Sequence, residues 1–168
     1  MVLVPDAGMA VKRWPPRNWV RLAEELAGRA LPVLACGAVQ GVPALPRMPL
    51  RRLAVFFAVV AENEGVVIGG DTGPVRLAEA AGARVVGLFG PTTVDRYGYM
   101  DRNVQGLPAC PHRKPLAITE QPCWWSAACP LSRDGPACMA DIAVSEVLGA
   151  VTEALKDPSP ACRSLARR

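Results

Sequence analysis

Glycines, a carboxylate and a hydroxyl follow one another directly after a short apolar run at residues 66–74, which read VVIGGDTGP. Glycines let a backbone approach a ligand closely, and the free amides at a helix N-terminus attract phosphate groups. If a helix begins near Pro74, this segment can bind a phosphate or diphosphate, with the Thr72 hydroxyl as an additional donor. Asp and Thr are also common helix caps, so Asp71 or Thr72 could simply close the first helical turn. The local pattern leaves both interpretations open.

A pair of cations stands before another expected helix, in the letters KRWPP at residues 12–16. Lys12 and Arg13 could bind the same phosphates from the opposite side of a cleft, because charge-assisted hydrogen bonds to phosphate are among the stronger polar contacts. The alternative is a solvated loop in which Trp14 packs against the core. Taken alone, this segment favours the second interpretation.

Four cysteines and one histidine fall within a segment that lacks hydrophobic periodicity. Four thiolates can hold zinc in a tetrahedral site or bind an iron–sulfur cluster. The spacing contains no C-x₂-C pair, which the common zinc sites have, so we expect reduced thiols packed under a loop and no metal or other cofactor. The candidate ligands are Cys110, Cys123, Cys129 and Cys138, with His112 close to the first. Trp124 and Trp125 are interpreted as packing residues rather than as a platform for a sugar.

Short apolar runs that alternate with helical patterns must position these groups. Strands are expected at residues 2–4, 32–36, 66–68 and 84–89, and helices at 15–28, 50–60 and 74–81. Strands that are apolar without alternation, each joined to the next by a helix, are typical of a parallel sheet covered on both faces. The predicted fold class is therefore α/β, a Rossmann-like parallel sheet with helices on both faces. Ligands of such sheets bind at the carboxyl ends of the strands.

One domain is expected over residues 1–156, since 168 residues is close to the length of a single domain. Within it, residues 93–140 are interpreted as a Cys/Trp-rich loop segment and residues 141–156 as an amphipathic C-terminal helix. The helix expected at 50–60 is apolar nearly all round, which predicts burial on more than one side. The basic tail at 157–168 is expected to be disordered.

The composition excludes several classes of protein. Hydrophobic residues make up 51% of the chain and charged residues 20%, as in a globular domain. The longest uninterrupted apolar run, residues 53–61, is far shorter than a bilayer-spanning helix, and the N-terminus has no signal-peptide pattern. Arginines are scattered despite a net charge of +4, so no nucleic-acid partner is expected. We expect a cytoplasmic protein without a transmembrane segment.

Four segments, taken together in order and approximate spacing, closely resemble glycosyltransferase family 9, the family of the lipopolysaccharide heptosyltransferases. They are KRWP at 12–15, GDTGP at 70–74, LAEAAG at 77–82 and LFGPT at 88–92. The resemblance implies the GT-B fold, in which two Rossmann-like halves face a cleft, and this chain is similar to the C-terminal half. That half binds a nucleotide-diphosphate sugar, typically ADP-heptose, and the acceptor is a lipopolysaccharide-type or other glycan or a lipid-linked acceptor. The implied reaction is inverting and metal-independent, with the protein peripheral at the inner face of the cytoplasmic membrane.

The resemblance also implies roles for single residues. Lys12 would neutralise the donor diphosphate, while Asp71, Thr72 and Gly73 would hold the sugar and the phosphates at the helix N-terminus. Further donor-binding candidates are Pro74, Arg76 and Thr92, followed by Arg13, Gly37, Asp95 and Arg96.

The chain departs from the family pattern at three points. Arg76 stands where many members have a histidine, and it is larger and always charged. Val39 stands at the approximate place of an acidic residue suited to ribose hydroxyls. No counterpart of the family's carboxylate base is found, so no catalytic residue is expected in this chain, and the base is expected in an N-terminal half.

Three functions are compatible with parts of this pattern. The leading hypothesis is the donor-binding half of such a glycosyltransferase, from a truncated or split gene, which turns over only with a separate N-terminal acceptor-binding half. The second is a non-catalytic nucleotide-binding or scaffold domain derived from such an enzyme. The third, an aspartic protease suggested by the letters DTG at 71–73, requires a β-rich fold, whereas residues 74–81 are expected to be helical.

Overall fold

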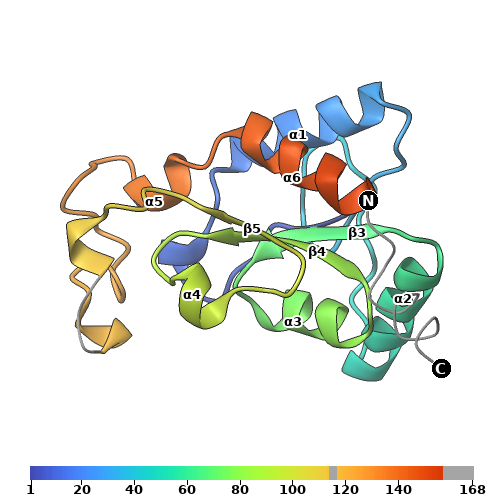
Figure 1. The fold of residues 1–168 in the computed structure, drawn as a ribbon, viewed down its shortest axis with the longest axis horizontal. Coiled ribbons are helices and arrows are strands. Elements are labelled where there is room, and N and C mark those ends of the chain that lie inside the picture. Colours follow the sequence, from blue (N-terminus) through green and yellow to red (C-terminus); the bar gives the residue numbers. More distant parts are fainter. Residues whose placement is uncertain (114–116, 157–168) are drawn as a thin grey trace.

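The computed structural model describes residues 1–113 and 117–156 and has a parallel sheet at its centre (Figure 1). In these residues the sheet has five strands in the order β2-β1-β3-β4-β5, and every neighbouring pair is parallel. The strands are β1 (Val2–Val4), β2 (Leu34–Ala35), β3 (Val66–Gly70), β4 (Arg84–Phe89) and β5 (Arg102–Gln105). The tail at 157–168, which was expected to be disordered, lies outside the described residues.

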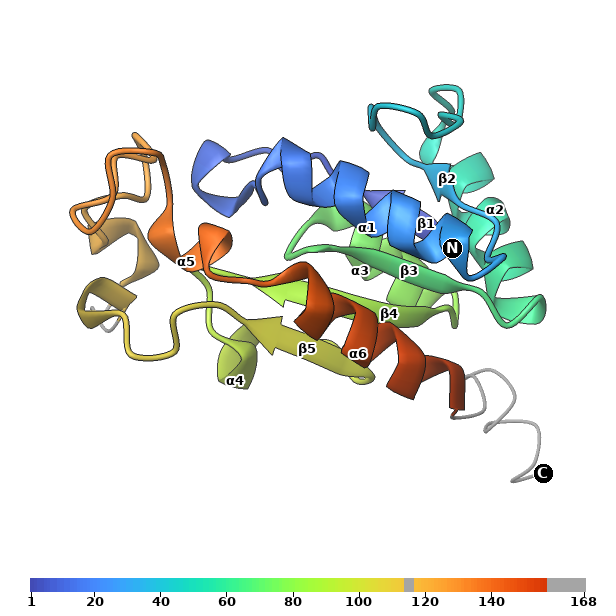
Figure 2. The ribbon, with the colours of Figure 1, turned by 90° about the horizontal axis from the view of Figure 1, so that it is seen from above.

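Helices cover both faces of the sheet. α1 (Pro16–Gly28) and α6 (Val144–Lys156) pack together on one face, and α2 (Leu50–Glu62) and α3 (Gly73–Ala80) lie on the other (Figure 1, Figure 2). Shorter elements are α4 (Val94–Tyr97), α5 (Ala137–Ala140) and the 3-10 turns η1 (Ala10–Lys12), η2 (Pro111–Arg113) and η3 (Ile118–Glu120). The sheet is thus the middle of three layers, and the predicted α/β, Rossmann-like class is confirmed.

Alternate residues of the inner strands face two separate hydrophobic cores. In β3, Ile68 faces the α1/α6 core together with Leu3 and Val86, its neighbours in register on β1 and β4. Val67 faces the α2/α3 core, which also contains Phe57. Burial of a large apolar side chain stabilises the fold by about 1.5–3 kcal/mol. Because both faces of the inner strands are buried, these strands contain no alternating polar residues.

The strand order places a crevice between β1 and β3. The chain runs from β1 outward to β2 through α1, and then returns past β1 to β3 through α2. The loops that follow β1 and β3 therefore lead to opposite faces of the sheet. In open parallel sheets, such a switch leaves a ligand-binding crevice beyond the carboxyl ends of the strands.

α2 is less buried than its sequence predicts. Only Phe57 and Ala61 are buried, whereas Leu50, Val55 and Val59 are 70%, 65% and 48% exposed. The helix lies at the margin of the molecule, where it packs against α3 and turns its other side outward (Figure 2). The expectation of burial on more than one side is wrong, because a helix at the margin has neighbours on one side only. In the part of the chain that the structure describes, no helix has the length and apolar character needed to span a bilayer.

Residues 93–140, interpreted from the sequence as a loop segment, contain α4, β5 and α5 as well as two 3-10 turns. β5 reads RNVQ and pairs with β4 along one side only, and none of its four residues is fully buried. A polar edge strand shows no hydrophobic run, which is why the sequence pattern missed it. The helix expected at 141–156 begins at Val144.

Candidate functional site

The loop after β1 and the β3–α3 turn meet at the crevice between their strands. Lys12 Nζ lies 2.8 Å from Asp71 Oδ2 and donates a longer hydrogen bond, of 3.3 Å, to the Asp71 carbonyl oxygen. The two side chains are 18% and 14% exposed, so the ion pair is partly shielded from water. Two segments that the sequence singled out separately, 59 residues apart, are thereby joined at one point.

The first turn of α3 is open to a ligand. Thr72 is the N-cap residue, yet its side chain makes no capping hydrogen bond, and the Asp71 carboxylate is paired with Lys12 instead. The Thr72 hydroxyl is buried and has no hydrogen-bond partner among the described residues. A Cβ atom placed on Gly73 would meet nothing within 4 Å. Thr72 therefore holds the N-cap position without capping through its side chain, and among the described residues no side chain occupies the amide groups that a helix leaves unsatisfied at this end.

Arg76 is held by several groups at once. Its guanidinium lies 3.0 Å from Asp71 Oδ1 and 3.7 Å from Glu79 Oε2, and it stacks 4.1 Å from the centre of the Tyr99 ring. It also donates hydrogen bonds to two carbonyl oxygens at the end of α4. Asp71 thus lies between two cations, and Arg76 fastens α3 to the segment that precedes β5.

Tyr99 supports the β3–α3 turn. Its hydroxyl donates a 2.8 Å hydrogen bond to the Gly70 carbonyl oxygen. Burial raises the pKa of Tyr99 well above its ordinary value, and the nearby Arg76 guanidinium offsets only part of that increase. The phenol therefore stays protonated at neutral pH and keeps donating this bond. No local signal in the sequence marks Tyr99, because the contact joins residues 29 positions apart.

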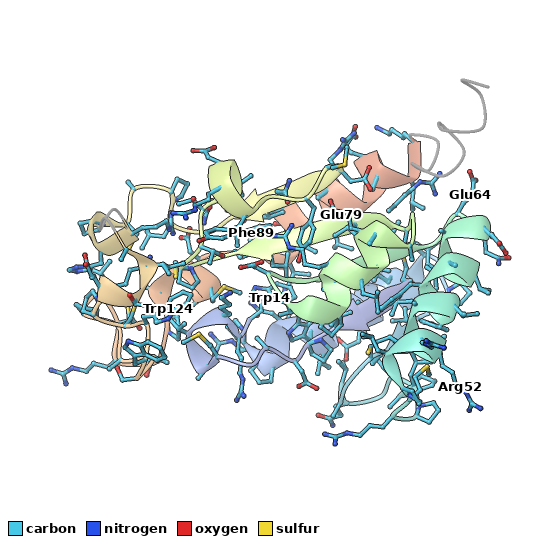
Figure 3. All side chains as sticks on the ribbon, turned by 90° about the horizontal axis from the view of Figure 1, so that it is seen from below. Trp14, Arg52, Glu64, Glu79, Phe89 and Trp124 are labelled. Carbon is cyan, nitrogen blue, oxygen red and sulfur yellow. The ribbon has the colours of Figure 1, made fainter. Side chains whose placement is uncertain are left out.

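Two tryptophans next to these segments are packing residues (both labelled in Figure 3). Trp14 is buried in the α1/α6 core and donates a 3.0 Å hydrogen bond to the Ile142 carbonyl oxygen. Trp124 is buried against the loop after β1, with its ring centre 5.4 Å from Lys12 Nζ. Trp125 is 75% exposed. The packing interpretation is therefore confirmed for Trp124 and is wrong for Trp125.

Three charged candidates do not join the Lys12–Asp71 pair. Arg13 donates a 3.3 Å hydrogen bond to the Ala7 carbonyl oxygen within its own loop. Asp95 and Arg96 are exposed on α4. Within the described residues, none of these three side chains is hydrogen-bonded to Asp71.

A pocket of about 450 Å³ opens beside the first turn of α3. It is lined by Pro74 of α3, by Gly37 after β2 and by Asp6 from the loop after β1, together with apolar side chains that include Val4, Leu45, Met48 and Leu53. Gly37 has a φ of +136°, a conformation that favours glycine, and a Cβ there would collide with Asp6 and Pro5. The sequence pattern marked Pro74 and Gly37 but not Asp6, because nothing local distinguishes this carboxylate from other surface acids.

Two more positions that the sequence analysis named are buried. Val39, which stands at the approximate place of the family's acidic residue, is 8% exposed and packs in the α1/α6 core. Thr92 is buried in the turn after β4. The side-chain amides of Gln105 and Gln121 hold this turn through hydrogen bonds to its carbonyl oxygens.

The five cysteines of the described residues are all free thiols. Burial raises the pKa of Cys138 to about 11 and also raises the pKa of Cys123, and neighbouring thiols add to both increases. Among the described residues, no three His, Cys, Asp or Glu side chains converge closely enough to hold a metal ion. Cys138 packs with Met139 against Gly90, where a Cβ atom would overlap the Met139 side chain and lie 3.1 Å from the Cys138 sulfur.

The chain was compared with known families and proteins. The family model described as glycosyltransferase family 9 (heptosyltransferase) matches residues 1–123. None of the curated proteins compared matches the chain.

Several solved structures share the fold. Escherichia coli heptosyltransferase WaaC with ADP has 17% identity and a TM-score of 0.61, over 91% of this chain and 43% of that chain. E. coli ADP-heptose lipopolysaccharide heptosyltransferase II has 16% identity and a TM-score of 0.65, over 92% of this chain and 46% of that chain. TibC is an iron-containing dodecameric heptosyltransferase of enterotoxigenic E. coli. Its complex with ADP-D-β-D-heptose has 16% identity and a TM-score of 0.71, over 92% of this chain and 44% of that chain. The chain therefore spans less than half the length of these GT-B proteins.

Proposed function

The chain belongs to glycosyltransferase family 9, and we propose that it is the donor-binding half of a glycosyltransferase. In this proposal it corresponds to the C-terminal half of the GT-B fold and binds ADP-heptose as the sugar donor. A lipopolysaccharide-type or other glycan accepts the sugar, with inversion and without a metal, at the inner face of the cytoplasmic membrane. Complexes of similar structures with ADP and ADP-heptose support this choice of nucleotide.

The open first turn of α3, facing the Lys12 ammonium, carries the proposal. A diphosphate placed there accepts a hydrogen bond from the amide of Gly73, and the Thr72 hydroxyl, which is buried in the free protein, donates a second one after its side chain rotates toward the ligand. The positive end of the helix dipole favours the same position for an anion. Asp71 keeps Lys12 directed toward this place, and the ammonium exchanges part of that contact for a phosphate oxygen.

The pocket beside α3 suits the nucleoside. Pro74 belongs both to the first turn of α3 and to the pocket wall, so a ligand with phosphates at the helix end extends directly into the pocket. The volume of about 450 Å³ lies within the range of roughly 300–1,000 Å³ that is usual for small-molecule sites. Leu45 and Met48 provide apolar contacts for the face of the base.

Transfer breaks the bond between the anomeric carbon and the diphosphate while an acceptor hydroxyl attacks the opposite face of that carbon. The leaving nucleoside diphosphate gains negative charge, which Lys12 and the N-terminus of α3 stabilise. The base that removes the acceptor's proton belongs to the second half of the GT-B fold in this proposal. We therefore expect the present chain to bind the donor and to turn it over only together with that half.

Calorimetric titration of the full chain with ADP, ADP-heptose and UDP-sugars tests the proposal. We expect ADP-heptose to bind more tightly than ADP, and both to bind more tightly than UDP-sugars. Lys12→Met should weaken ADP binding by about 10- to 100-fold, because it removes a charge-assisted hydrogen bond to phosphate. The matched control is Lys156→Met, since that ammonium pairs with Glu153 at the exposed end of α6. Unchanged ADP affinity in the Lys12 variant would contradict the proposed phosphate site.

A non-catalytic nucleotide-binding or scaffold domain is the second candidate. Arg76 favours it. The family resemblance implies that Arg76 contacts the donor, but its guanidinium is already paired with carboxylates and carbonyl oxygens of the protein. The same titrations separate the two candidates. Equal affinity for ADP and for its sugar conjugates would support the scaffold.

A further inference from the structure

The pocket beside α3 contains one carboxylate that no protein group uses. Asp6 is exposed, and it makes no hydrogen bond or ion pair with any other described residue. It lies directly beside Gly37, since a Cβ on that glycine would lie 2.7 Å from Asp6 Oδ2. The carboxylate thus lies between the carboxyl ends of β1 and β2, where a side chain at position 37 would displace it.

The other walls of the pocket offer little to a polar ligand. Burial, together with the nearby Asp6 carboxylate, raises the pKa of Cys36, so this thiol stays neutral. Arg47 is the other charged lining residue, and the structure gives it no contact with Asp6. Most of the remaining lining is apolar. A ligand with hydroxyl donors next to an apolar ring would match this combination of one carboxylate and an apolar wall.

We propose that Asp6 accepts hydrogen bonds from the ribose hydroxyls of the donor nucleotide and thereby selects ribonucleotides. The assignment rests on the proposed function, because it requires the diphosphate at the first turn of α3. With the phosphates beside Lys12, the ribose comes next along the ligand and meets the pocket mouth, and the base follows into the apolar part. Asp6 is the carboxylate among the described residues that line this pocket, whereas Val39 is buried in the α1/α6 core.

The sign of the Asp6→Asn effect separates direct contact from mere proximity. A carboxylate that only lies near an anionic ligand repels it, so neutralising that carboxylate strengthens binding. A carboxylate that accepts hydrogen bonds from ribose strengthens binding, so neutralising it weakens binding. The two accounts therefore predict opposite changes in ADP affinity.

Calorimetry on the full chain with ADP, 2′-deoxy-ADP and 3′-deoxy-ADP provides the test. We expect the wild type to bind ADP about tenfold or more tightly than at least one deoxy analogue, as the loss of a hydrogen bond to a charged group predicts. Asp6→Asn should weaken ADP binding by a similar factor and remove the discrimination between ADP and that analogue. Asp134→Asn, at an exposed acid outside the pocket, is the matched control and should change neither value.

Several outcomes would overturn the assignment. If the wild-type protein binds ADP and both deoxy analogues equally well, it makes no hydrogen bond to the ribose hydroxyls. This outcome rejects the assignment from the wild-type titrations alone. Tighter ADP binding by Asp6→Asn, or discrimination that persists in this variant, would also reject the role of Asp6 while leaving the phosphate site intact. Failure of the folded wild type to bind ADP at all would reject the proposed function and, with it, this assignment.

Discussion

Replacing Thr72 by valine should make the free protein more stable and the nucleotide bind more weakly. The Thr72 hydroxyl is buried without a partner among the described residues, so folding removes its hydration without a compensating bond. Removal of a buried unpaired hydroxyl is expected to recover about 1–2 kcal/mol. Valine keeps the β-branched shape, which the extended backbone at this position (φ −140°, ψ 157°) accepts. For a chain of this length we expect the melting temperature to rise by ~2–8 °C.

The same substitution removes the donor that the proposed site offers to phosphate. A hydrogen bond to a charged group contributes about 1.5–3 kcal/mol, so ADP affinity should fall by about 10- to 150-fold. Thermal unfolding followed by circular dichroism and calorimetric titration with ADP measure the two effects separately.

Thr152→Val is the matched control for this experiment. The Thr152 hydroxyl donates a 2.8 Å hydrogen bond to the Leu148 carbonyl oxygen within α6, so its loss brings no gain in stability and no change in ADP affinity. A Thr72→Val protein that is less stable than the wild type and binds ADP equally well would refute the reasoning. The hydroxyl would then have a partner inside the protein and none on the ligand.

Three further predictions concern the charges, the helix margin and the thiols. Asp71→Asn leaves two cations facing each other in a partly shielded site, so urea denaturation should show a free energy of unfolding lower by about 1–3 kcal/mol. Calorimetry should show tighter binding of inorganic diphosphate. A more stable variant would contradict this prediction. Phe57→Ala should lower the free energy of unfolding by about 3–5 kcal/mol and Val55→Ser by less than ~0.5 kcal/mol, since only the first side chain is buried, and similar losses would mean that α2 is covered on both sides. Burial raises the pKa of Cys138 from 9 to about 11, so the folded state binds the thiol proton more tightly. Stability should therefore be fully present below pH 9 and fall as pH rises toward 11, and Cys138→Ala should flatten this decline in urea titrations at each pH.

The inner strands could be predicted from the sequence because packing requires the same property that the pattern detects. β3 and β4 are buried on both faces, so nearly every residue along them is apolar or glycine. β5 has no such requirement on its outer side, and its polar residues form side-chain hydrogen bonds that only the folded chain brings together. The burial of α2 was predicted wrongly for the opposite reason, since apolar residues such as Val55 lie at the surface.

The centre of the site could be located from the sequence, but its supporting contacts could not. Loops at the carboxyl ends of adjacent parallel strands must meet, which is sufficient to bring Lys12 close to Asp71. The contacts of Arg76 with the end of α4, and of Tyr99 with the β3–α3 turn, depend on how a polar edge strand folds back. Asp6 is equally inaccessible to pattern analysis, because the role proposed for it depends on the absence of a side chain at Gly37 and on a pocket that the loops after β1 and β2 form with α2 and α3.

We expect Arg76, the second cation beside Asp71, to determine whether Lys12 can act on a ligand. Lys12 is held by Asp71 at 2.8 Å, so a ligand recruits the ammonium only if Asp71 does not lose its last counter-charge. Arg76 lies 3.0 Å from the other carboxylate oxygen, so in the proposed site it would keep Asp71 neutralised while Lys12 turns toward a phosphate. Arg76→Gln should therefore weaken inorganic diphosphate binding by about tenfold, even though the wild-type Arg76 pairs with Asp71 and not with the ligand. In the variant, Lys12 becomes the carboxylate's only partner cation within the described residues. Calorimetry on the single variants and on the Lys12→Met/Arg76→Gln double variant measures this coupling, and losses that simply add would show that the two cations act independently.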